Sequence, residues 1–525
     1  MSAASVPLAI AGADFRERVR RYSFLFTLGF ALYLGYLAST GNLVLELGHA
    51  RGIYNSAWVG ALLSLVASAF ISLAGFYFVK NTIQRDRETR VGQILAATPI
   101  SKFTYVLGKM FSNLAVLTLM LAVLALSGIA MQLIDGEDRH ILLWNLMSPF
   151  ILLAFPAMAV VAAFAVLFES IPFLRGGFGN IAYFFLWITG LSIPITTRNH
   201  VSDLIGISVV ADSARNAAHL SAESGGVTFA LTFGELHGPL STFQWDGLPW
   251  TTEMVVSRVI WLAFALGIVV LSAFFFDRFD PSRGKVLREA QEVLPAVLPE
   301  QTIASYHATL TQAATLTPLA GLKFQSRFLA MVAAELRLML QGQKWWWYVV
   351  AAGLAIASAA APSASARGML LAVAWIWPVL LWSSMGVRET REQTYQLIFS
   401  APHPVARQLP AIWCAGFLLA LLTGCGFGAR LLLSGNLRGA MAWLIGALFI
   451  PTFALGLGVW SGTGKPFEIL YTLLWYVGPL HSTTALDFMG SAPATAGTRY
   501  PMIYLVFAGV FGLAAVAGRK RQLQS

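Results

Sequence analysis

Long stretches without a charged side chain alternate with short charged segments along the whole sequence. Twelve stretches contain no Asp, Glu, Lys or Arg, and a helix of about 20 apolar residues is long enough to cross a bilayer. Backbone polar groups in hydrocarbon must be bonded within the segment, so these stretches are expected to be helices. The pattern predicts an all-α polytopic membrane protein with about 12 transmembrane helices. They lie at residues 22–45, 57–79, 110–133, 141–168, 176–197, 259–276, 345–366, 368–387, 408–429, 439–464, 469–486 and 500–518.

The composition excludes an ordinary soluble domain. Apolar residues make up 57% of the chain, charged residues make up 11%, and the mean hydropathy is +0.68. Soluble domains are about one quarter charged. The net charge of +10 is explained by the excess of basic residues that cytoplasmic loops of membrane proteins carry. We therefore expect the lipid bilayer, and no nucleic acid, as a partner of this chain.

An even number of spans places both termini on the same side of the membrane. If that side is the cytoplasm, only nine of the 35 basic residues lie on the outer side, as the positive-inside rule requires. We expect a multi-pass protein of the cell (inner or plasma) membrane with both termini cytoplasmic. The nine outer residues are then Arg51, Arg139, Arg198, Arg215, Arg258, Arg367, Arg430, Arg438 and Arg499.

The charged loop after the second stretch recurs after the eighth. The first copy reads RDRETRVGQILAATPISKFTYVLGK from Arg85, and the second reads RETREQTYQLIFSAPHPVARQLP from Arg388. Such internal similarity at one fixed offset indicates a repeated structural unit. An offset of 303 residues aligns Arg85 with Arg388, Asp86 with Glu389, Gln93 with Gln396 and Pro99 with Pro402.

A second offset, of 288 residues, aligns the fifth and eleventh stretches. It places Tyr183, Trp187 and Gly190 on Tyr471, Trp475 and Gly478. Two halves with the same number of spans insert in parallel and are related by an axis along the membrane normal. We predict a first six-span half at 1–276 with a long outer loop at 198–258. A cytoplasmic linker at 277–344 and a second six-span half at 345–525 follow.

Each repeated loop contains a short amphipathic helix. In the first loop, Val91 and Ile94 share one face beyond a run of alternating charges, and Leu397 and Ile398 repeat this in the second. A helix of this kind at the inner end of a bundle is suited to docking on a soluble partner. The alternative is that the charges only fix the topology while the apolar face rests on lipid. Two matched copies favour docking.

The first loop, with its charged run, the ATP-I-S turn and the LGK entry to the next helix, resembles the cytoplasmic loop of type-2 ABC exporter permeases. The likeness extends more weakly to the second loop, where His403-Pro404 replace Ile-Ser and no LGK follows. In that family each half has six spans, a connecting helix before its first span and a coupling helix that seats on an ATPase. The resemblance implies connecting helices at Asp14–Arg21 and Phe324–Leu340, and coupling helices at Arg85–Ala97 and Arg388–Ser400.

The resemblance implies the permease subunit of an ATP-driven exporter, which forms the path for an unknown substrate. It also implies a separate ABC ATPase subunit as partner, in two copies, because there are two coupling helices. ATP and magnesium are expected in that partner, and no cofactor or metal is expected in this chain. The residues expected to dock the ATPase are Arg85, Asp86, Arg87, Glu88 and Arg90, with Arg388, Glu389, Arg391 and Glu392 in the second half.

The chain itself is not expected to be an enzyme. A P-loop needs GxxxxGK followed by Ser or Thr, because backbone amides cradle the phosphates and the hydroxyl binds magnesium. The nearest string has Val459 five residues before Gly464 and has Pro466 where the hydroxyl is needed. ATP hydrolysis is therefore assigned to the partner subunit.

An ion-gradient-driven secondary transporter is the main alternative, since such carriers also have two six-span halves. They usually keep an ionisable residue at mid-membrane, whereas none of the twelve stretches contains a charge. Glu169 and Asp277 lie at cytoplasmic ends and Arg258 at an outer end, from where each side chain is expected to reach the interface.

A membrane enzyme is the third reading, but no nucleophile triad can be recognised in the sequence. The outer segment carries His200, His219, Glu235 and His237, whose spacing fits no metal-ligand pattern. These residues are expected to belong to a small lid over the path.

Overall fold

The structure is a computed structural model, and the chain divides into two compact units. Unit 1 is Met1–Leu294 and unit 2 is Pro295–Ser525, so the division falls within the predicted linker. The described residues are 5–20, 22–41, 43–48, 50–197, 203–218, 229–233, 241–279, 327–392, 394–400, 404–480, 484–492 and 494–523.

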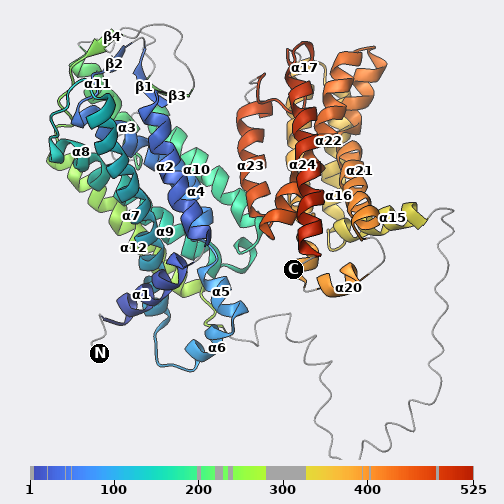
Figure 1. Ribbon diagram of the computed structural model, residues 1–525, viewed down its shortest axis with the longest axis horizontal. Coiled ribbons are helices and arrows are strands. Elements are labelled where there is room, and N and C mark those ends of the chain that lie inside the picture. The colour runs from blue at the N-terminus through green and yellow to red at the C-terminus, as the bar shows by residue number, and fades with distance from the viewer. Residues whose placement is uncertain are drawn as a thin grey trace, which may run out of the picture. The chain divides into compact units, whose positions relative to one another are not determined.

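Unit 1 is a bundle of helices with a small sheet at one end (Figure 1). Two of its apolar helices are interrupted by π-helical turns, η1 (Ala67–Ile71) and η2 (Phe150–Ala154). Its helices are α1 (Ser5–Val19), α2 (Tyr22–Ser39), α3 (Ser56–Val66), α4 (Ser72–Val79), α5 (Thr82–Glu88), α6 (Val91–Ala96), α7 (Lys102–Asp135), α8 (Leu143–Pro149), α9 (Phe155–Ser170), η3 (Pro172–Leu174), α10 (Gly177–Thr197), α11 (Ile207–Ala217) and α12 (Thr252–Phe275).

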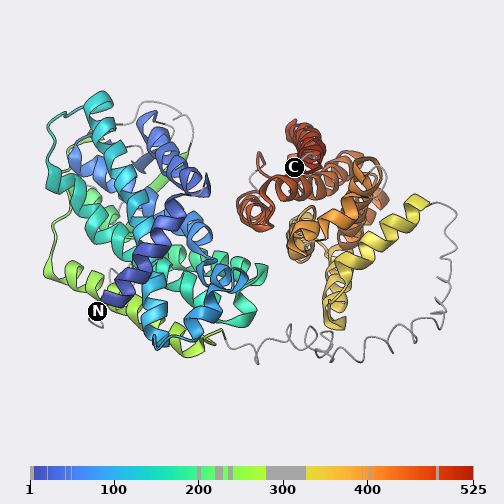
Figure 2. The ribbon, with the colours of Figure 1, turned by 60° about the horizontal axis from the view of Figure 1, so that its bottom comes forward.

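Unit 2 is also a helical bundle, and the first of its described helices, α15, lies across the direction of the long helices of this unit (Figures 1 and 2). Its helices are α15 (Arg327–Leu340), α16 (Trp345–Ala360), α17 (Ala364–Ile376), α18 (Val379–Ser383), α19 (Arg388–Arg391), α20 (Tyr395–Phe399), α21 (Pro404–Leu433), α22 (Leu437–Ser461), α23 (Lys465–Trp475), η6 (Tyr476–Leu480), η7 (Thr495–Gly497) and α24 (Tyr500–Gln522).

Seven helical segments of the described chain are long and apolar enough to cross a membrane. This confirms the expectation of a helical, polytopic membrane protein. Helix also occurs within each of the other predicted stretches, but those segments are shorter or less apolar, and their crossing stays a prediction. The seven are Ser56–Glu88, Lys102–Asp135, Leu143–Ser170, Thr252–Phe275, Val405–Leu433, Leu437–Ser461 and Tyr500–Gln522.

A four-stranded sheet is the element that the sequence did not predict. Its order is β3-β1-β2-β4, with β1 (Leu43–Leu47), β2 (Ala50–Gly52), β3 (Phe229–Phe233) and β4 (Ser241–Phe243). The end of the first predicted stretch is therefore a strand and not helix. Its Leu43, Val44, Leu45 and Leu47 are all buried, and Glu46 is partly exposed, so this strand is covered on both faces. The four predicted lid residues, His200, His219, Glu235 and His237, lie outside the described residues.

Both segments predicted as connecting helices are helical. The first, α1, begins nine residues earlier than Asp14, at Ser5, and ends at Val19. The second, α15, runs from Arg327 to the predicted end at Leu340, and the predicted residues 324–326 lie outside the described residues. α1 packs on α7, and α15 packs on α21. The stretch before Asp14 is apolar, so it extends the helix along its neighbour instead of ending it.

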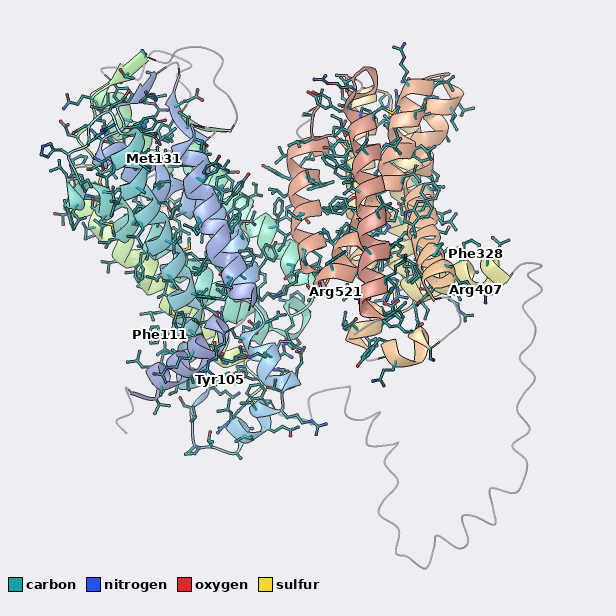
Figure 3. All side chains as sticks on the ribbon, in the orientation of Figure 1. Tyr105, Phe111, Met131, Phe328, Arg407 and Arg521 are labelled. Carbon is teal, nitrogen blue, oxygen red and sulfur yellow. The ribbon has the colours of Figure 1, made fainter. Side chains whose placement is uncertain are left out.

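The repeated loops lie between the same neighbours in both units. In unit 1, α5 and α6 join α4 to α7, at the end of the bundle opposite the sheet (Figure 1). Tyr105 lies at that end of α7, and Met131 lies near the sheet (Figure 3). In unit 2, α19 and α20 join α18 to α21. Ser101 caps α7 by accepting the backbone N–H of Thr104, which sets where the first loop ends.

Candidate docking site and the charge networks behind it

A buried carboxylate holds the first turn of α5. Glu169, at the end of α9, is 1% exposed, and its two oxygens accept four consecutive backbone N–H groups. The distances are 2.6 Å from Asn81, 3.0 Å from Thr82, 2.6 Å from Ile83 and 3.1 Å from Gln84. The first N–H groups of a helix have no partner within the helix, so Glu169 satisfies them and also opposes the positive end of its dipole.

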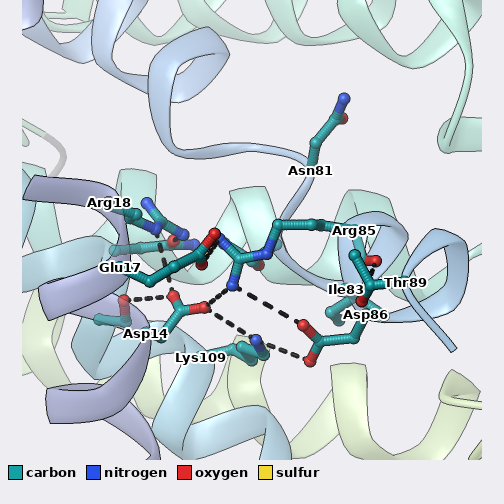
Figure 4. A network of polar contacts seen from close by, with 12 residues as sticks. Asp14, Glu17, Arg18, Asn81, Ile83, Arg85, Asp86, Thr89 and Lys109 are labelled. Carbon is teal, nitrogen blue, oxygen red and sulfur yellow. Dashed lines mark hydrogen bonds and ion pairs between the residues drawn. The ribbon is translucent and has the colours of Figure 1, made fainter. Parts of the chain in front are cut away.

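Asp14 of α1 is the centre of a second network, which Figure 4 shows. Its carboxylate, 3% exposed as a side chain, pairs with Arg18 at 3.2 Å, Lys109 at 3.0 Å and Arg85. It also accepts a hydrogen bond from the Ser112 hydroxyl. α1, α5 and α7 are thereby joined through one side chain.

The cations around Asp14 decide its protonation. Burial by itself raises the pKa of Asp14, but Arg18, Lys109, the Ser112 hydroxyl and Arg85 outweigh it and hold the pKa well below the usual range. The carboxyl group therefore stays ionised at every physiological pH, and its ion pairs are permanent features of the fold.

Asp86 faces inward from α5 toward α7. The residue is 5% exposed; its carboxylate accepts from the Tyr105 hydroxyl at 2.7 Å and pairs with Lys109 at 2.8 Å. Lys109 lies between Asp86 and Asp14 and pairs with both. Arg85 pairs with Asp14, with Glu17 and, at 3.7 Å, with Asp86.

Arg87 contacts the segment that leaves α12. It pairs with Asp277, which also pairs with Arg175 at 3.1 Å. Burial raises the pKa of Asp277, but Arg87 and Arg175 outweigh it and lower the pKa overall. The guanidinium of Arg278 donates to the Thr98 carbonyl at 2.6 Å. The end of α12 is therefore tied to both sides of the loop.

The rest of the first loop faces outward. Glu88 and Arg90 are exposed, and so are Val91 at 43% and Ile94 at 69%. A buried Gly92 lies opposite, where a Cβ would come within 2.5 Å of the Phe279 ring. The amphipathic helix predicted from the sequence therefore exposes an apolar patch bordered by both signs of charge.

The second loop, like the first, has charged residues that pair within the unit and others that are exposed. Arg388 pairs with Glu335 of α15 at 3.3 Å. Glu389, 5% exposed, accepts from Arg519 at 3.2 Å and from the Gln408 amide at 3.1 Å. Arg391 and Glu392 are exposed and lie 3.6 Å apart.

Several contacts in unit 1 recur in unit 2 at the offsets found in the sequence. In unit 1 the Tyr105 hydroxyl donates to the Asp86 carboxylate, and in unit 2 the Gln408 amide donates to the Glu389 carboxylate. Both residues of the second pair lie 303 positions after those of the first. The Tyr183 hydroxyl donates to the Ser72 carbonyl, and the Tyr471 hydroxyl donates to the Trp375 carbonyl, each at 2.8 Å. The indole pair matches as well: Trp187 donates to the Ala69 carbonyl, and Trp475 donates to the Ala372 carbonyl.

A third matched feature follows α10 in unit 1 and η6 in unit 2. The sequence analysis did not predict it. Asp203 and Asp487 are at most 1% exposed, and each is followed three residues later by a glycine with positive φ, Gly206 and Gly490. The Asp203 carboxylate accepts the N–H groups of Gly206 and Ser208. The Asp487 carboxylate accepts those of residues 491 and 492. The shared D-x-x-G spacing was the signal that could have revealed it.

The predicted docking residues thus fall into three groups. Glu88, Arg90, Arg391 and Glu392 are exposed, whereas Asp86 and Glu389 are buried in contacts within their own units. The remaining three are half-buried and form ion pairs within their own units: Arg85, Arg87 and Arg388. Reversing the charge of Asp86 and Glu389 would place Lys or Arg against Lys109 and Arg519, so we expect it to disturb the fold as well as docking. Docking by any of these residues stays a prediction.

Two charges that were expected to extend toward the membrane interface are buried inside unit 1. The Glu169 carboxylate is directed to the backbone of α5, whose N–H groups it accepts. Arg258 is 2% exposed and donates to the Asp203 carbonyl at 2.6 Å instead of extending to the surface. Helix α12 begins at Thr252, so Arg258 lies almost two helical turns after its first residue.

The helices and their buried charges define a polytopic helical membrane protein. Comparisons with models of protein families, with curated proteins and with solved structures gave no match.

Acidification is expected to affect the two units differently. Burial raises the pKa of Glu335, and Arg388 only partly offsets this, whereas the pKa of Asp14 is lowered. A raised carboxyl pKa means that the folded state favours the neutral form, so the contribution of Glu335 to stability falls as pH rises through that pKa. We expect Glu335→Gln to unfold at an equal or higher temperature than the parent at pH 7.5, and the difference to vanish near about pH 5. Melting curves at both pH values test this; a large loss at pH 7.5 would contradict it.

Proposed function

We propose that the chain is the complete membrane part of an ATP-driven exporter, a permease of twelve spans in two tandem halves that binds two separate ABC ATPase subunits. The observation that carries the proposal is the repeated loop, which joins α4 to α7 in unit 1 and α18 to α21 in unit 2. In each unit an inner arginine ties this loop to the helix predicted as the connecting helix, through Arg85 with Asp14 of α1 and Arg388 with Glu335 of α15. The outward residues remain exposed.

The matched hydrogen bonds of the two units support the tandem arrangement. Contacts made by Tyr183 and Trp187 recur at Tyr471 and Trp475, with partners displaced by 303 residues. Two unrelated bundles would not be expected to share them. Two docking loops on one chain then favour two ATPase copies, which supply the ATP and magnesium chemistry.

The first loop is bonded to its neighbours in such a way that a movement imposed on it by a partner would reach other helices. Ion pairs link α5 to α1 and α7 through Asp14, and Glu169 links its first turn to α9. A displacement of α5 would therefore move three other helices, since packed elements shift as units.

The alternative is an ion-gradient-driven secondary transporter, and Arg258 is the observation on its side. It lies within a candidate span and is buried, and its Nε and Nη2 groups have no hydrogen-bond partner among the residues that the structure describes. Intramembrane ionisable residues often serve transport.

Purification of the tagged chain from its native host distinguishes the ATP-driven exporter from the secondary transporter. An exporter should co-purify with an ATP-hydrolysing subunit at two copies per chain. If the chain purifies alone and moves a solute when an ion gradient is imposed, the alternative holds.

Single substitutions on the exposed faces test which loop binds each copy. Tyr395, at the start of α20, is 37% exposed. We expect Ile94→Asp or Tyr395→Asp to reduce the recovered ATPase from two copies to one, because each places a charge on an exposed apolar surface of its loop. Ile134→Asp is the matched control, since Ile134 is also 69% exposed but lies at the other end of α7. Unchanged recovery in both loop variants would remove these loops as the docking site.

A further inference from the structure

The last turn of α24 contacts the second repeated loop, and the end of this helix lies beside α20 (Figure 1). Arg519, which is 1% exposed, pairs with Glu389 of α19 at 3.2 Å. Its guanidinium also lies 4.8 Å from the centroid of the Phe399 ring, at the end of α20. One side chain of α24 therefore holds both short helices of the loop. Three residues further on, the Gln522 amide donates to the Val459 carbonyl of α22 at 2.8 Å, which ties the same turn to α22.

The buried carboxylate at the equivalent position of the first loop is neutralised by a different helix. Asp86 pairs with Lys109 of α7 at 2.8 Å. The offset of 303 residues places Ile412 of α21 on Lys109, so α21 offers no cation at this position. Among the described residues, Arg519 is the cation that pairs with Glu389. The charge that the third long helix supplies in unit 1 is thus supplied by the C-terminal helix in unit 2.

Unit 1 also joins its loop to its last long helix, but through other residues. Directly after α12, Asp277 pairs with Arg87 of α5, and the Arg278 guanidinium donates to the Thr98 carbonyl at 2.6 Å. The signs are reversed, because the helix end contributes the acid to this ion pair in unit 1 and the base in unit 2. The offset of 303 places Thr390 on Arg87, so the pair itself is not repeated. The link between these two elements recurs where its residues do not.

We propose that α24 receives the movement of the second docking loop through Arg519, as the end of α12 receives that of the first loop through Asp277. Arg519 is a positioning residue in this scheme, since it acts on the loop and contacts no substrate. α24 packs along α22, and both are candidate spans, so a displaced loop would move two long helices together. The inference rests on the proposed function for the source of the movement, an ATPase, but the link itself is measurable without one.

Arg519→Gln tests the link by hydrogen exchange in the purified full-length chain. We expect exchange at residues 394–399 to be about a hundredfold faster, because the buried Glu389 carboxylate loses its cation. Exchange at residues 516–522 should also be faster, because the end of α24 loses its contact with the loop. Residues 91–96 of the first loop should exchange at the parent rate. Lys520→Gln is the matched control, since it removes the same charge from the adjacent, exposed residue.

Adding Ile412→Lys to Arg519→Gln separates neutralisation of Glu389 from the link to α24. Position 412 lies one turn after Gln408, which already donates to Glu389, so a lysine there should pair with this carboxylate. We expect slow exchange to return at residues 394–399 but not at 516–522, because the lysine belongs to α21. In the complex, ATP hydrolysis should remain below the parent level while two ATPase copies are still recovered. This double variant also carries the test if Arg519→Gln alone does not fold.

Two results would overturn the proposal. One is unchanged exchange at residues 394–399 in folded Arg519→Gln, and the other is a double variant that hydrolyses ATP at the parent rate, since Arg519 would then only neutralise a buried charge. If no ATPase co-purifies with the parent chain, the proposed function fails, and exchange at residues 516–522 decides this inference alone. Return of that segment to the parent rate in the double variant would then refute the link, and continued fast exchange would support it.

Discussion

Replacing Asp14 of α1 with Asn is expected to destabilise unit 1 more than any single exchange within the first loop. The substitution keeps the shape of the side chain and removes a buried charge that pairs with Arg18, Arg85 and Lys109. Breaking one partner of a buried ion pair costs about 3–5 kcal/mol, because the remaining charges stay desolvated. For a unit of this size we expect the melting temperature to fall by about 10 °C.

The pKa of Asp14 fixes how that loss depends on pH. Because this pKa is lowered in the folded state, the carboxylate stabilises the fold at all pH values above the usual range for Asp, and the contribution disappears only as pH falls below that range. The difference between parent and Asp14→Asn should therefore be the same at pH 7.5 and at about pH 5.5.

Glu335→Gln is the matched comparison for this experiment, since Glu335 pairs with Arg388 in unit 2 as Asp14 pairs with Arg85 in unit 1. Within the described residues, the ion pair of Glu335 is with Arg388, which is 28% exposed as a side chain, so little stability is expected from the pair. Equal losses for Asp14→Asn and Glu335→Gln would mean that the cluster around Asp14 adds nothing beyond a single pair.

The sequence predicted the helices well because their signal is local. Uncharged stretches set by composition coincide with helical segments, and the loop beginning at Arg85 has the helix and the exposed face that its pattern indicated. The sheet was not predicted, because β1 is an apolar run shortly after α2. An apolar run alone does not distinguish a strand from the end of a helix.

The partners of the buried charges could not be read from the sequence. Asp14 and Lys109 are separated by 95 residues, and Glu169 and Ile83 by 86, so no local period links them. The sequence analysis singled out Asp86 and Glu389, but the sequence does not show whether a carboxylate is buried in its unit or exposed. The exposed members of both loops are what the docking hypothesis now rests on.

Replacing Glu169 with Gln is expected to release the first turn of α5 without unfolding the bundle. A Gln side chain offers one acceptor oxygen, and its NH₂ group would face N–H groups that now bond to a carboxylate. Leaving such buried donors unpaired costs about 2–4 kcal/mol. Hydrogen exchange at residues 81–84 should therefore be about a hundredfold faster.

Ser170→Ala is the neighbouring control, because the Ser170 hydroxyl bonds only within its own helix, to the Val166 carbonyl. Glu169→Asp retains the charge on a shorter side chain and should give an intermediate exchange rate. If α5 also carries force from an ATPase, Glu169→Gln should lower transport-coupled ATP hydrolysis while the subunits still co-purify, since the exposed Ile94 is untouched. Unchanged exchange at residues 81–84 would show that neighbouring packing, and not the carboxylate, holds the loop, and α5 would then have no direct link to α9.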